Sequence, residues 1–349
     1  MRVKPEIIKE RILEFIKHNP ACSSQEILSG LNLEIGTTTL KRYLQDLIQN
    51  EFIIPTGKNK ARRYSISLSY DVLRSIDVDE YFTKEIDQRV IQNTYNSQLI
   101  IETLYKIALF TSQEIETLNK QLQVFKSNTS KLTKEEFSNE MERLAIDLSW
   151  KSSQIEGNTY TLLETELLLK EKQTASGKTK DEATMLLNHK EALDFVLLQP
   201  NYINPLSISR IEDIHSLLVK DLNISRNIRN TRVGISGTNY KPLDNEFQIR
   251  EALEEMCKLI NSKTNVFEKA LLALVLISYI QPFSDGNKRT ARIISNAILI
   301  NNHYCPISFR TVESIEYKKA MLVFYEQTNI NPFKRVFMNQ FEFAVNTYF

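Results

Sequence analysis

The sequence is poor in the residues that mark several classes of protein. Its 349 residues include three cysteines, eight glycines, nine prolines and one tryptophan. The cysteines, Cys22, Cys257 and Cys305, lie too far apart for a disulfide framework or a metal-ligand pattern, and their number suits a reducing cytoplasm. So few glycines and prolines leave long stretches with helical spacing of apolar residues. These predict a mostly α protein.

Excess charge and long apolar runs are also absent. The formal net charge is +1, so the chain as a whole carries no nucleic-acid or membrane signal. Its longest apolar run, residues 270–280, is too short to span a bilayer, and residues 1–15 have no apolar signal-peptide core. We therefore expect a cytoplasmic protein without a membrane partner. Its length favours two or more domains.

Residues 1–69 predict a small basic domain. Helical spacing indicates three helices, the last over residues 37–50, followed by two short strands that flank a Lys-rich turn. This order predicts a winged helix-turn-helix. The segment holds eleven Lys or Arg against seven Asp or Glu, and that local excess favours contact with DNA phosphates.

The candidate DNA-binding residues lie on the third helix and on the wing: Thr37, Thr38, Thr39, Lys41, Arg42, Lys58, Lys60, Arg62 and Arg63. The alternative is a protein-interaction or dimerisation module, because fold alone does not determine function. Residues 70–130 follow as a helical connector with the first helices of the next part. Residues 131–349 then form an all-α domain with its core at about 205–310.

One loop organises that second part. Residues 278–292 read SYIQPFSDGNKRTAR, between an apolar run and an amphipathic one, so they predict a loop leading into a helix. Gly286 permits a tight turn, and the helix N-terminus suits a phosphate. Arg289 and Arg292 share a helix face, and Asp285 is a hard oxygen ligand for Mg²⁺. An ordinary capped turn is the alternative for Asp285-Gly286-Asn287 alone.

The whole string resembles the signature of the Fic family, His-x-Phe-x-(Asp/Glu)-Gly-Asn-Gly-Arg-x-x-Arg, whose members mostly move AMP from ATP to a protein hydroxyl. The resemblance implies Mg²⁺ binding by Asp285 and a packing role for Phe283. It implies an ATP-binding site formed by Asp285, Gly286, Asn287, Lys288, Arg289 and Arg292.

Two positions depart from the signature. Gln281 stands where the family has its catalytic base, a histidine, and an amide cannot accept a proton near neutral pH. Lys288 replaces the second glycine, as it does in the kinase-like branch of the family, which transfers phosphate instead of AMP. Nucleotide binding is therefore better supported than any one transfer reaction.

A second string, SSQIEGN at residues 152–158, follows a predicted helix. A capped helix end would explain Gly157 but not Glu156. The string also resembles the Fic inhibitory motif, (Ser/Thr)-x-x-x-Glu-(Gly/Asn), filled here by Ser152, Glu156 and Gly157. The resemblance implies that Glu156 pairs with Arg292, and a guanidinium held by a carboxylate is not free to bind phosphate.

Residues 228–242 predict a small β-hairpin, because two glycines and β-branched residues precede a proline. By resemblance this is the Fic flap, which would hold an extended target segment by strand pairing. The candidate target-binding residues are Ile235, Ser236, Gly237, Thr238, Asn239 and Tyr240. The alternative is a surface hairpin without function.

Three functions follow from these patterns. The leading one is an autoinhibited, Mg²⁺-dependent adenylyltransferase whose transfer is weakened or lost because of Gln281. The second is a DNA-binding regulator that uses a degenerate Fic domain to sense nucleotide. The third is a kinase-like phosphotransferase. The expected partners are a protein target and, for the second function, double-stranded DNA, with a second copy of the chain as a further candidate.

Overall fold

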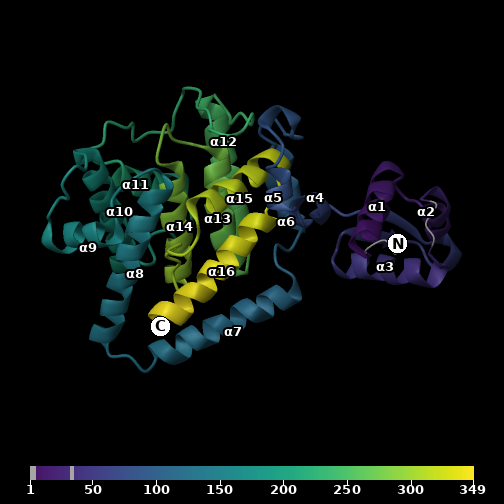
Figure 1. Cartoon of the computed structure of the whole chain (residues 1–349), viewed down its shortest axis with the longest axis horizontal. Coiled ribbons are helices and arrows are strands. Elements are labelled where there is room, and N and C mark those ends of the chain that lie inside the picture. Colours follow the sequence, from purple (N-terminus) through teal and green to yellow (C-terminus); the bar gives the residue numbers. More distant parts are fainter. Residues whose placement is uncertain (1–4, 32–34) are drawn as a thin grey trace. The chain divides into compact units, whose positions relative to one another are not determined.

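The computed structural model describes residues 5–31 and 35–349. The chain divides into two compact units, which are considered separately below (Figure 1). The first comprises Met1–Ser75 with Lys106–Thr111, and the second Ile76–Tyr105 with Ser112–Phe349. Within the described residues, no helix is both long and apolar enough to cross a bilayer.

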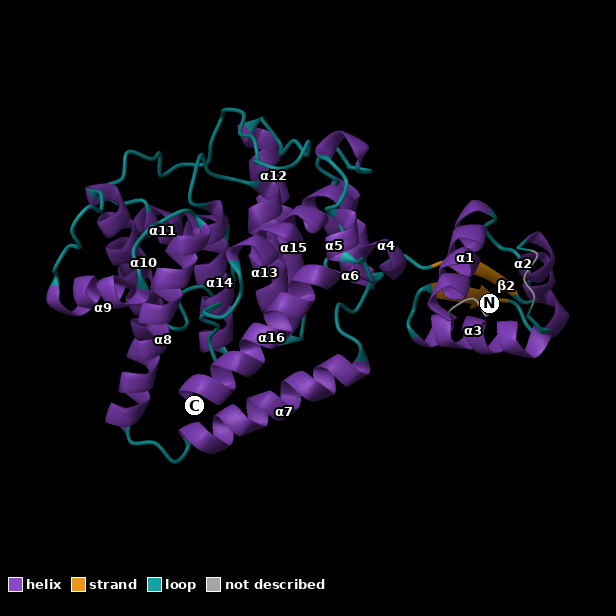
Figure 2. Cartoon of the chain, viewed as in Figure 1, coloured by secondary structure: helices purple, strands orange, loops and turns teal. Residues whose placement is uncertain are grey.

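The first unit contains the elements that the sequence predicts, in the same order. They are α1 (Pro5–His18), α2 (Ser24–Gly30), α3 (Thr37–Gln49), β1 (Ile53–Thr56) and β2 (Arg63–Ile66), and the structure adds η1 (Asn59–Ala61) and α4 (Ser69–Leu73). The strands pair antiparallel, with Ile53 opposite Ile66 (Figure 2). Ser23 caps α2 in a capping box with Glu26, which explains why the helix begins there. One apolar core joins the helices to the strands.

The described part of the second unit is built from helices joined by loops, the longest of which separates α11 from α12. Its elements are α5 (Val78–Tyr81), η2 (Ile86–Gln88), η3 (Leu99–Thr103), α6 (Leu104–Lys106, at the boundary between the units), α7 (Ser112–Thr129), α8 (Lys134–Ile155), α9 (Leu162–Glu171), α10 (Lys180–Leu198), α11 (Ile208–Leu218), α12 (Glu246–Ser262), α13 (Val266–Ile280), α14 (Asn287–Asn301), α15 (Ser314–Gln327) and α16 (Asn331–Tyr348). The predicted mostly α fold is confirmed.

Helices α13 and α14 pack against each other at the centre of this unit (Figure 1). Every residue of α13 from Ala270 to Ile280 is fully buried, because its apolar side chains contact neighbours all round the helix. On their outer sides, α14 contacts α8, α10 and α11, whereas α13 contacts α12, α15 and α16. The loop that joins α13 to α14 is therefore set in a rigid surrounding.

The prediction of a β-hairpin over residues 228–242 is wrong. This flap segment, as we call it, is a loop with a turn at Ser236 and Gly237, and no strand pair forms within it. Its backbone bonds to groups outside the segment instead. Thr94 and Lys241 make a parallel bridge, and Arg229 N–H donates to the Pro282 carbonyl at 3.0 Å.

Candidate functional site

The loop from Gln281 to Gly286 turns twice through left-handed backbone conformations. Gln281 ends α13 with φ at 52°, and Gly286 begins α14 with φ at 82°. A Cβ at Gly286 would lie 3.3 Å from His215 Nε2 and 3.4 Å from Val219 Cγ1. Gly286 thus meets two demands, a backbone angle that L side chains rarely adopt and a close approach to α11.

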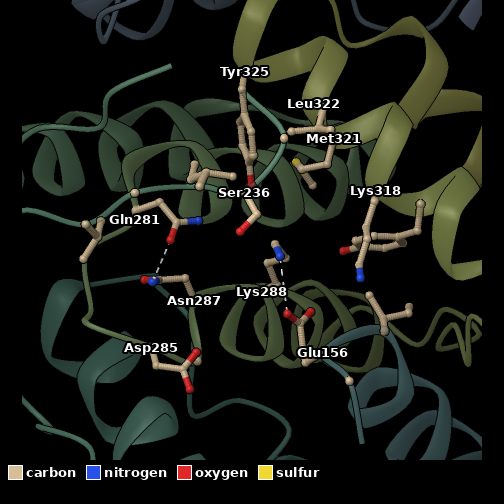
Figure 3. Close-up of a pocket in the computed structure, with 18 of the residues that line it drawn as sticks. Glu156, Ser236, Gln281, Asp285, Asn287, Lys288, Lys318, Met321, Leu322 and Tyr325 are labelled. Carbon is tan, nitrogen blue, oxygen red and sulfur yellow. Dashed lines mark hydrogen bonds and ion pairs between the residues drawn. The ribbon is translucent and has the colours of Figure 1, made fainter. Parts of the chain in front are cut away.

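The Asn287 side chain holds this loop in shape. Its Oδ1 accepts the Phe283 N–H at 2.8 Å, and its Nδ2 donates to the Phe283 carbonyl at 2.8 Å and to Gln281 Oε1 at 3.0 Å. Gln281 Nε2 in turn donates to the Ser278 carbonyl at 2.7 Å. Both ends of the Gln281 amide are therefore occupied within the protein. Figure 3 shows the bond to Asn287.

His215 of α11 packs against this loop. Its ring stacks on Phe283 with centroids 3.6 Å apart, and its Nε2 lies 2.9 Å from the Asp285 carbonyl oxygen. Burial lowers the pKa of His215 to about 4, so the ring is neutral at physiological pH. From the sequence, the place of this histidine within the α11 apolar pattern predicts packing rather than catalysis and gives no signal of its bond to the loop.

Arg229 ties the flap segment to the same loop. Its Nε donates to the Gln281 carbonyl at 2.6 Å, its Nη1 to the Thr231 carbonyl at 2.6 Å, and its Nη2 to the Leu243 carbonyl at 2.5 Å. Three carbonyl oxygens bind one buried guanidinium, and they belong to Thr231 in the flap segment, to Leu243 just after it and to Gln281 at the end of α13. The sequence gives no sign of this role, because the partners of Arg229 are backbone atoms and no pattern of residue types indicates them.

The predicted contact between Glu156 and Arg292 is present. Arg292 Nη2 donates to Glu156 Oε1 at 2.7 Å, and Arg292 also donates to the Ser152 hydroxyl at 2.8 Å and to the Ser152 carbonyl at 3.0 Å. Lys288 Nζ lies 3.3 Å from Glu156 Oε2. Burial by itself raises the pKa of Glu156, but Arg292 and Lys288 outweigh it, and the net pKa is lowered. Glu156 is therefore an ionised carboxylate.

A cavity of about 560 Å³ lies between the loop, the flap segment and α15 (Figure 3). Its polar end is lined by Glu156, Gln281, Asp285, Gly286, Asn287 and Lys288. Its other end is lined by Val233, Gly234, Ile235, Ser236 and Gly237 of the flap segment and by Ile315, Met321, Leu322 and Tyr325 of α15. Tyr317 and Lys318 of α15 also line the cavity. A site with one polar and one mainly apolar end matches a ligand with a charged and an aromatic part.

Several predicted residues do not line this cavity. Arg289 and Arg292 are 1% and 0% exposed and lie beneath it. Arg289 donates to Asp285 Oδ2 at 3.1 Å, and Arg292 donates to Glu156 Oε1 at 2.7 Å. Among the predicted flap residues, Thr238, Asn239 and Tyr240 are also absent from the lining. The Tyr240 side chain is buried, and its hydroxyl donates to the Tyr279 carbonyl at 3.0 Å.

In the first unit, a second cavity of about 1070 Å³ lies between α2, α3 and the turn after β1. Five of the predicted DNA-binding residues line it: Lys41, Lys58, Lys60, Arg62 and Arg63. Thr37, Thr38, Thr39 and Arg42 lie outside its lining, on the first turns of α3. The turn after β1 and one face of α3 thus form a basic groove.

Residues 205–299 match the model of the Fic/DOC family, so this part of the chain is a Fic/DOC domain. The chain is 30% identical over 209 residues to the protein adenylyltransferase Fic of Nematostella vectensis, and 26% identical over 203 residues to the protein adenylyltransferase fic-1 of Caenorhabditis elegans. These alignments cover 57% and 56% of the chain. They cover 47% and 39% of the two relatives, so the chain spans less than half the length of either.

Two solved structures share the fold. One is Fic-1 of Caenorhabditis elegans, with a TM-score of 0.60 and 20% identity over 72% of this chain and 81% of that one. The other is a Fic domain containing signaling protein from Bacteroides thetaiotaomicron, with a TM-score of 0.56 and 19% identity over 66% of this chain and 95% of that one. At this identity the likeness supports the fold and leaves the activity to the residues of the site.

Proposed function

We propose that this chain is a Fic-type protein adenylyltransferase that binds ATP with Mg²⁺ and transfers AMP slowly to a protein hydroxyl, with Glu156 as its inhibitor. The cavity beside the α13–α14 loop, the Fic/DOC match and the adenylyltransferase names of the relatives support this function.

The position of Glu156 carries the proposal. Its carboxylate lines the cavity, whereas Arg292, to which it binds, is buried beneath it. A phosphate that enters the polar end must compete with this carboxylate for the guanidinium, because both are anions of similar geometry. Removal of Glu156 would leave Arg292 and Lys288 with uncompensated positive charge facing the cavity. ATP binding is therefore weak while Glu156 is in place.

The polar end also has the groups that a magnesium–nucleotide complex requires. The Asp285 side chain is 63% exposed and lines the cavity, so one of its oxygens can bind a cation. Within the described residues, no three His, Cys, Asp or Glu side chains gather as a metal cage. That suits Mg²⁺, which keeps several waters and binds through one or two carboxylates together with substrate phosphates. When bound, Mg²⁺ would neutralise phosphate charge.

In the proposed transfer, the oxygen of a target hydroxyl bonds to the α-phosphorus of ATP. The bond from that phosphorus to the β-phosphate oxygen breaks, and diphosphate leaves. The hydroxyl proton passes to water, because the Gln281 amide is no base and its two polar atoms already bond to Ser278 and Asn287. Loss of a positioned base commonly costs ~10²- to 10⁴-fold in rate, so slow transfer is expected.

Isothermal titration of ATP with Mg²⁺ into the wild-type chain and into Glu156→Gly tests the site and its inhibitor. We expect at least tenfold tighter binding in the variant. Label from α-³²P-ATP on a co-incubated protein, and none from γ-³²P-ATP, supports AMP transfer, and the reverse favours the kinase-like reaction. Absence of ATP binding in both chains would reject the proposal.

A second function, DNA binding by the first unit as a winged helix-turn-helix, is favoured by the basic groove. Five cations line one concave surface, and the exposed residues Thr37 and Thr38 lie at the N-terminus of α3, where recognition helices contact base edges. Counterion release from phosphates would make such binding weaken steeply with salt.

The DNA proposal predicts that Lys60→Ala and Arg62→Ala reduce the slope of log Kd against log salt by about one each. Fluorescence anisotropy with duplexes from a random library would measure it. Lys17→Ala is the matched control, because Lys17 pairs with Asp71 at 3.3 Å and lies outside the groove lining. Equal slopes for all variants would favour the protein-interaction alternative.

A further inference from the structure

The connector that precedes the helical core lies against the flap segment. The Lys241 N–H donates to the Asn93 carbonyl at 2.9 Å, next to the parallel bridge between Thr94 and Lys241. Asn239 Nδ2 donates to Asp87 Oδ1 at 3.3 Å. The connector therefore occupies one side of the flap segment. The connector itself lies outside the residues that match the Fic/DOC model.

Arg89 of this connector reaches the turn of the flap segment. Its Nη2 donates to the Gly237 carbonyl at 2.8 Å, and its Nη1 lies 3.3 Å from Glu326 Oε1 on α15. The two side chains of this ion pair are only 3% and 0% exposed. The guanidinium also lies 4.9 Å from the ring centroid of Phe82. One planar group thus joins the flap turn by a hydrogen bond and α15 by an ion pair, in a nearly dry environment where electrostatic interactions are strong.

The backbone of this turn makes few hydrogen bonds. Among the residues that the structure describes, the bond from Arg89 is the only hydrogen bond to the backbone of residues 233–237. The same residues line the mainly apolar end of the cavity, opposite Met321, Leu322 and Tyr325 of α15. Arg89 therefore links the flap turn, which lines one side of this end, to α15, whose residues line the other side.

We propose that Arg89 is a positioning residue that fixes the flap turn against α15 and thereby shapes the end of the cavity that takes the nucleoside of ATP. It touches neither the loop after α13 nor the phosphate-binding end. Loss of Arg89 should therefore release the flap segment and weaken binding of the nucleoside while phosphate binding is retained. The nucleoside part of this inference rests on the proposed function, and the flap part does not.

Limited trypsin digestion of the full chain tests the flap part. Arg232 is 88% exposed and precedes Val233, so its peptide bond is a substrate once the segment is mobile, whereas Pro242 blocks cleavage after Lys241. We expect Arg89→Gln to speed cleavage after Arg232 by about tenfold or more, as loss of one charge-assisted hydrogen bond implies. Lys319→Gln is the control, because Lys319 also joins the connector to α15, through Asp79 at 2.9 Å, without touching the flap segment.

Arg89→Lys guards against misfolding, because it keeps a cation opposite Glu326 but lacks the planar fork that reaches two partners. We expect cleavage at a rate between wild type and Arg89→Gln, with an unchanged melting temperature. Cleavage of both Arg89 variants at the rate of Lys319→Gln would overturn the proposal.

The nucleoside part is tested in the Glu156→Gly background with two probes, ATP with Mg²⁺ and inorganic tripolyphosphate with Mg²⁺. Arg89→Gln should weaken ATP binding about tenfold or more and leave tripolyphosphate binding unchanged. An equal loss for both probes would mean that Arg89 acts on the whole fold, and would reject the positioning role. If neither probe binds Glu156→Gly itself, the proposed function fails, and the trypsin result still decides the flap part.

Discussion

Glu156 is bound by two cations of α14 at once. Its Oε1 accepts from Arg292 Nη2 at 2.7 Å, and its Oε2 lies 3.3 Å from Lys288 Nζ. Arg292 was expected from the inhibitory motif, whereas Lys288 was the departure that suggested a kinase-like reaction. In this structure Lys288 contacts the same carboxylate that binds the buried arginine.

This double contact predicts effects of opposite sign for Lys288→Met in two backgrounds. In the wild-type chain, the substitution removes one cation from Glu156, so ATP should bind several-fold more tightly. In Glu156→Gly, it removes a cation from the phosphate-binding end, so ATP should bind several-fold more weakly. Titration calorimetry on the four chains gives the coupling, for which neighbouring charges typically show ~0.5–3 kcal/mol.

Lys318→Met is the matched control for that cycle, because Lys318 lines the cavity and makes no ion pair with Glu156 among the described residues. Its effect on ATP binding should have the same sign in both backgrounds. A change of sign for Lys318→Met as well would show that the cycle reports general charge and not the contact with Glu156.

Restoring the base should restore transfer. In the Glu156→Gly background, Gln281→His should raise the rate of AMP transfer by ~10²- to 10⁴-fold, because an imidazole can take the target's proton. The rate should rise with pH through the ordinary histidine range near ~6.5. Incorporation of label from α-³²P-ATP, followed over time at several pH values, measures both. A rate that stays at background while ATP still binds would show that the missing base is not the defect.

Gly286 and Gly177 form a matched pair for measuring the cost of the loop's geometry. Both have positive φ, 82° and 76°, but a Cβ at Gly177 would meet nothing within 4 Å, whereas one at Gly286 would crowd His215 and Val219. Gly177→Ala should cost about 1 kcal/mol of unfolding free energy, and Gly286→Ala about 1–3 kcal/mol more. Urea denaturation checks this, and equal losses would show that α11 yields freely to the added methyl.

His215 predicts a loss of stability in weak acid. Burial lowers its pKa to about 4 in the folded protein, below the ordinary value of ~6.5, so the unfolded chain binds more protons between these pH values. The contribution of neutral His215 to the unfolding free energy is therefore complete above pH ~6.5, and it is lost as the pH falls toward the folded pKa. Its size is on the order of 3 kcal/mol.

Urea denaturation of the wild type and of His215→Gln at pH 7 and at pH 4.5 measures this contribution as a difference of differences. The wild type should lose more unfolding free energy than the variant over that interval, whatever the variant's stability at pH 7. Other groups that titrate in both chains, including buried His189, cancel in the comparison. Equal losses of unfolding free energy in the two chains would contradict the low pKa of His215.

The sequence anticipated those parts of the site that depend on neighbours along the chain. Gly286, Asn287 and the arginines of α14 follow from a turn and a helix N-terminus. The flap segment shows where such reasoning fails. Glycines and β-branched residues are typical of a hairpin, but a strand needs partners, and here Arg89, Asn93 and Pro282 bind its backbone instead.

By itself, the sequence determined the helical composition, the loop between two apolar helices and the residues that resemble the Fic signature and its inhibitory motif. Only the tertiary structure decided that Glu156 meets Arg292 and Lys288, that Arg229 joins the flap segment to the loop, and that Arg89 reaches the Gly237 carbonyl. The physical reason is that helix periodicity and turns arise from interactions a few residues apart. These contacts join side chains to atoms about fifty to one hundred and fifty residues away, which only packing brings within hydrogen-bond distance.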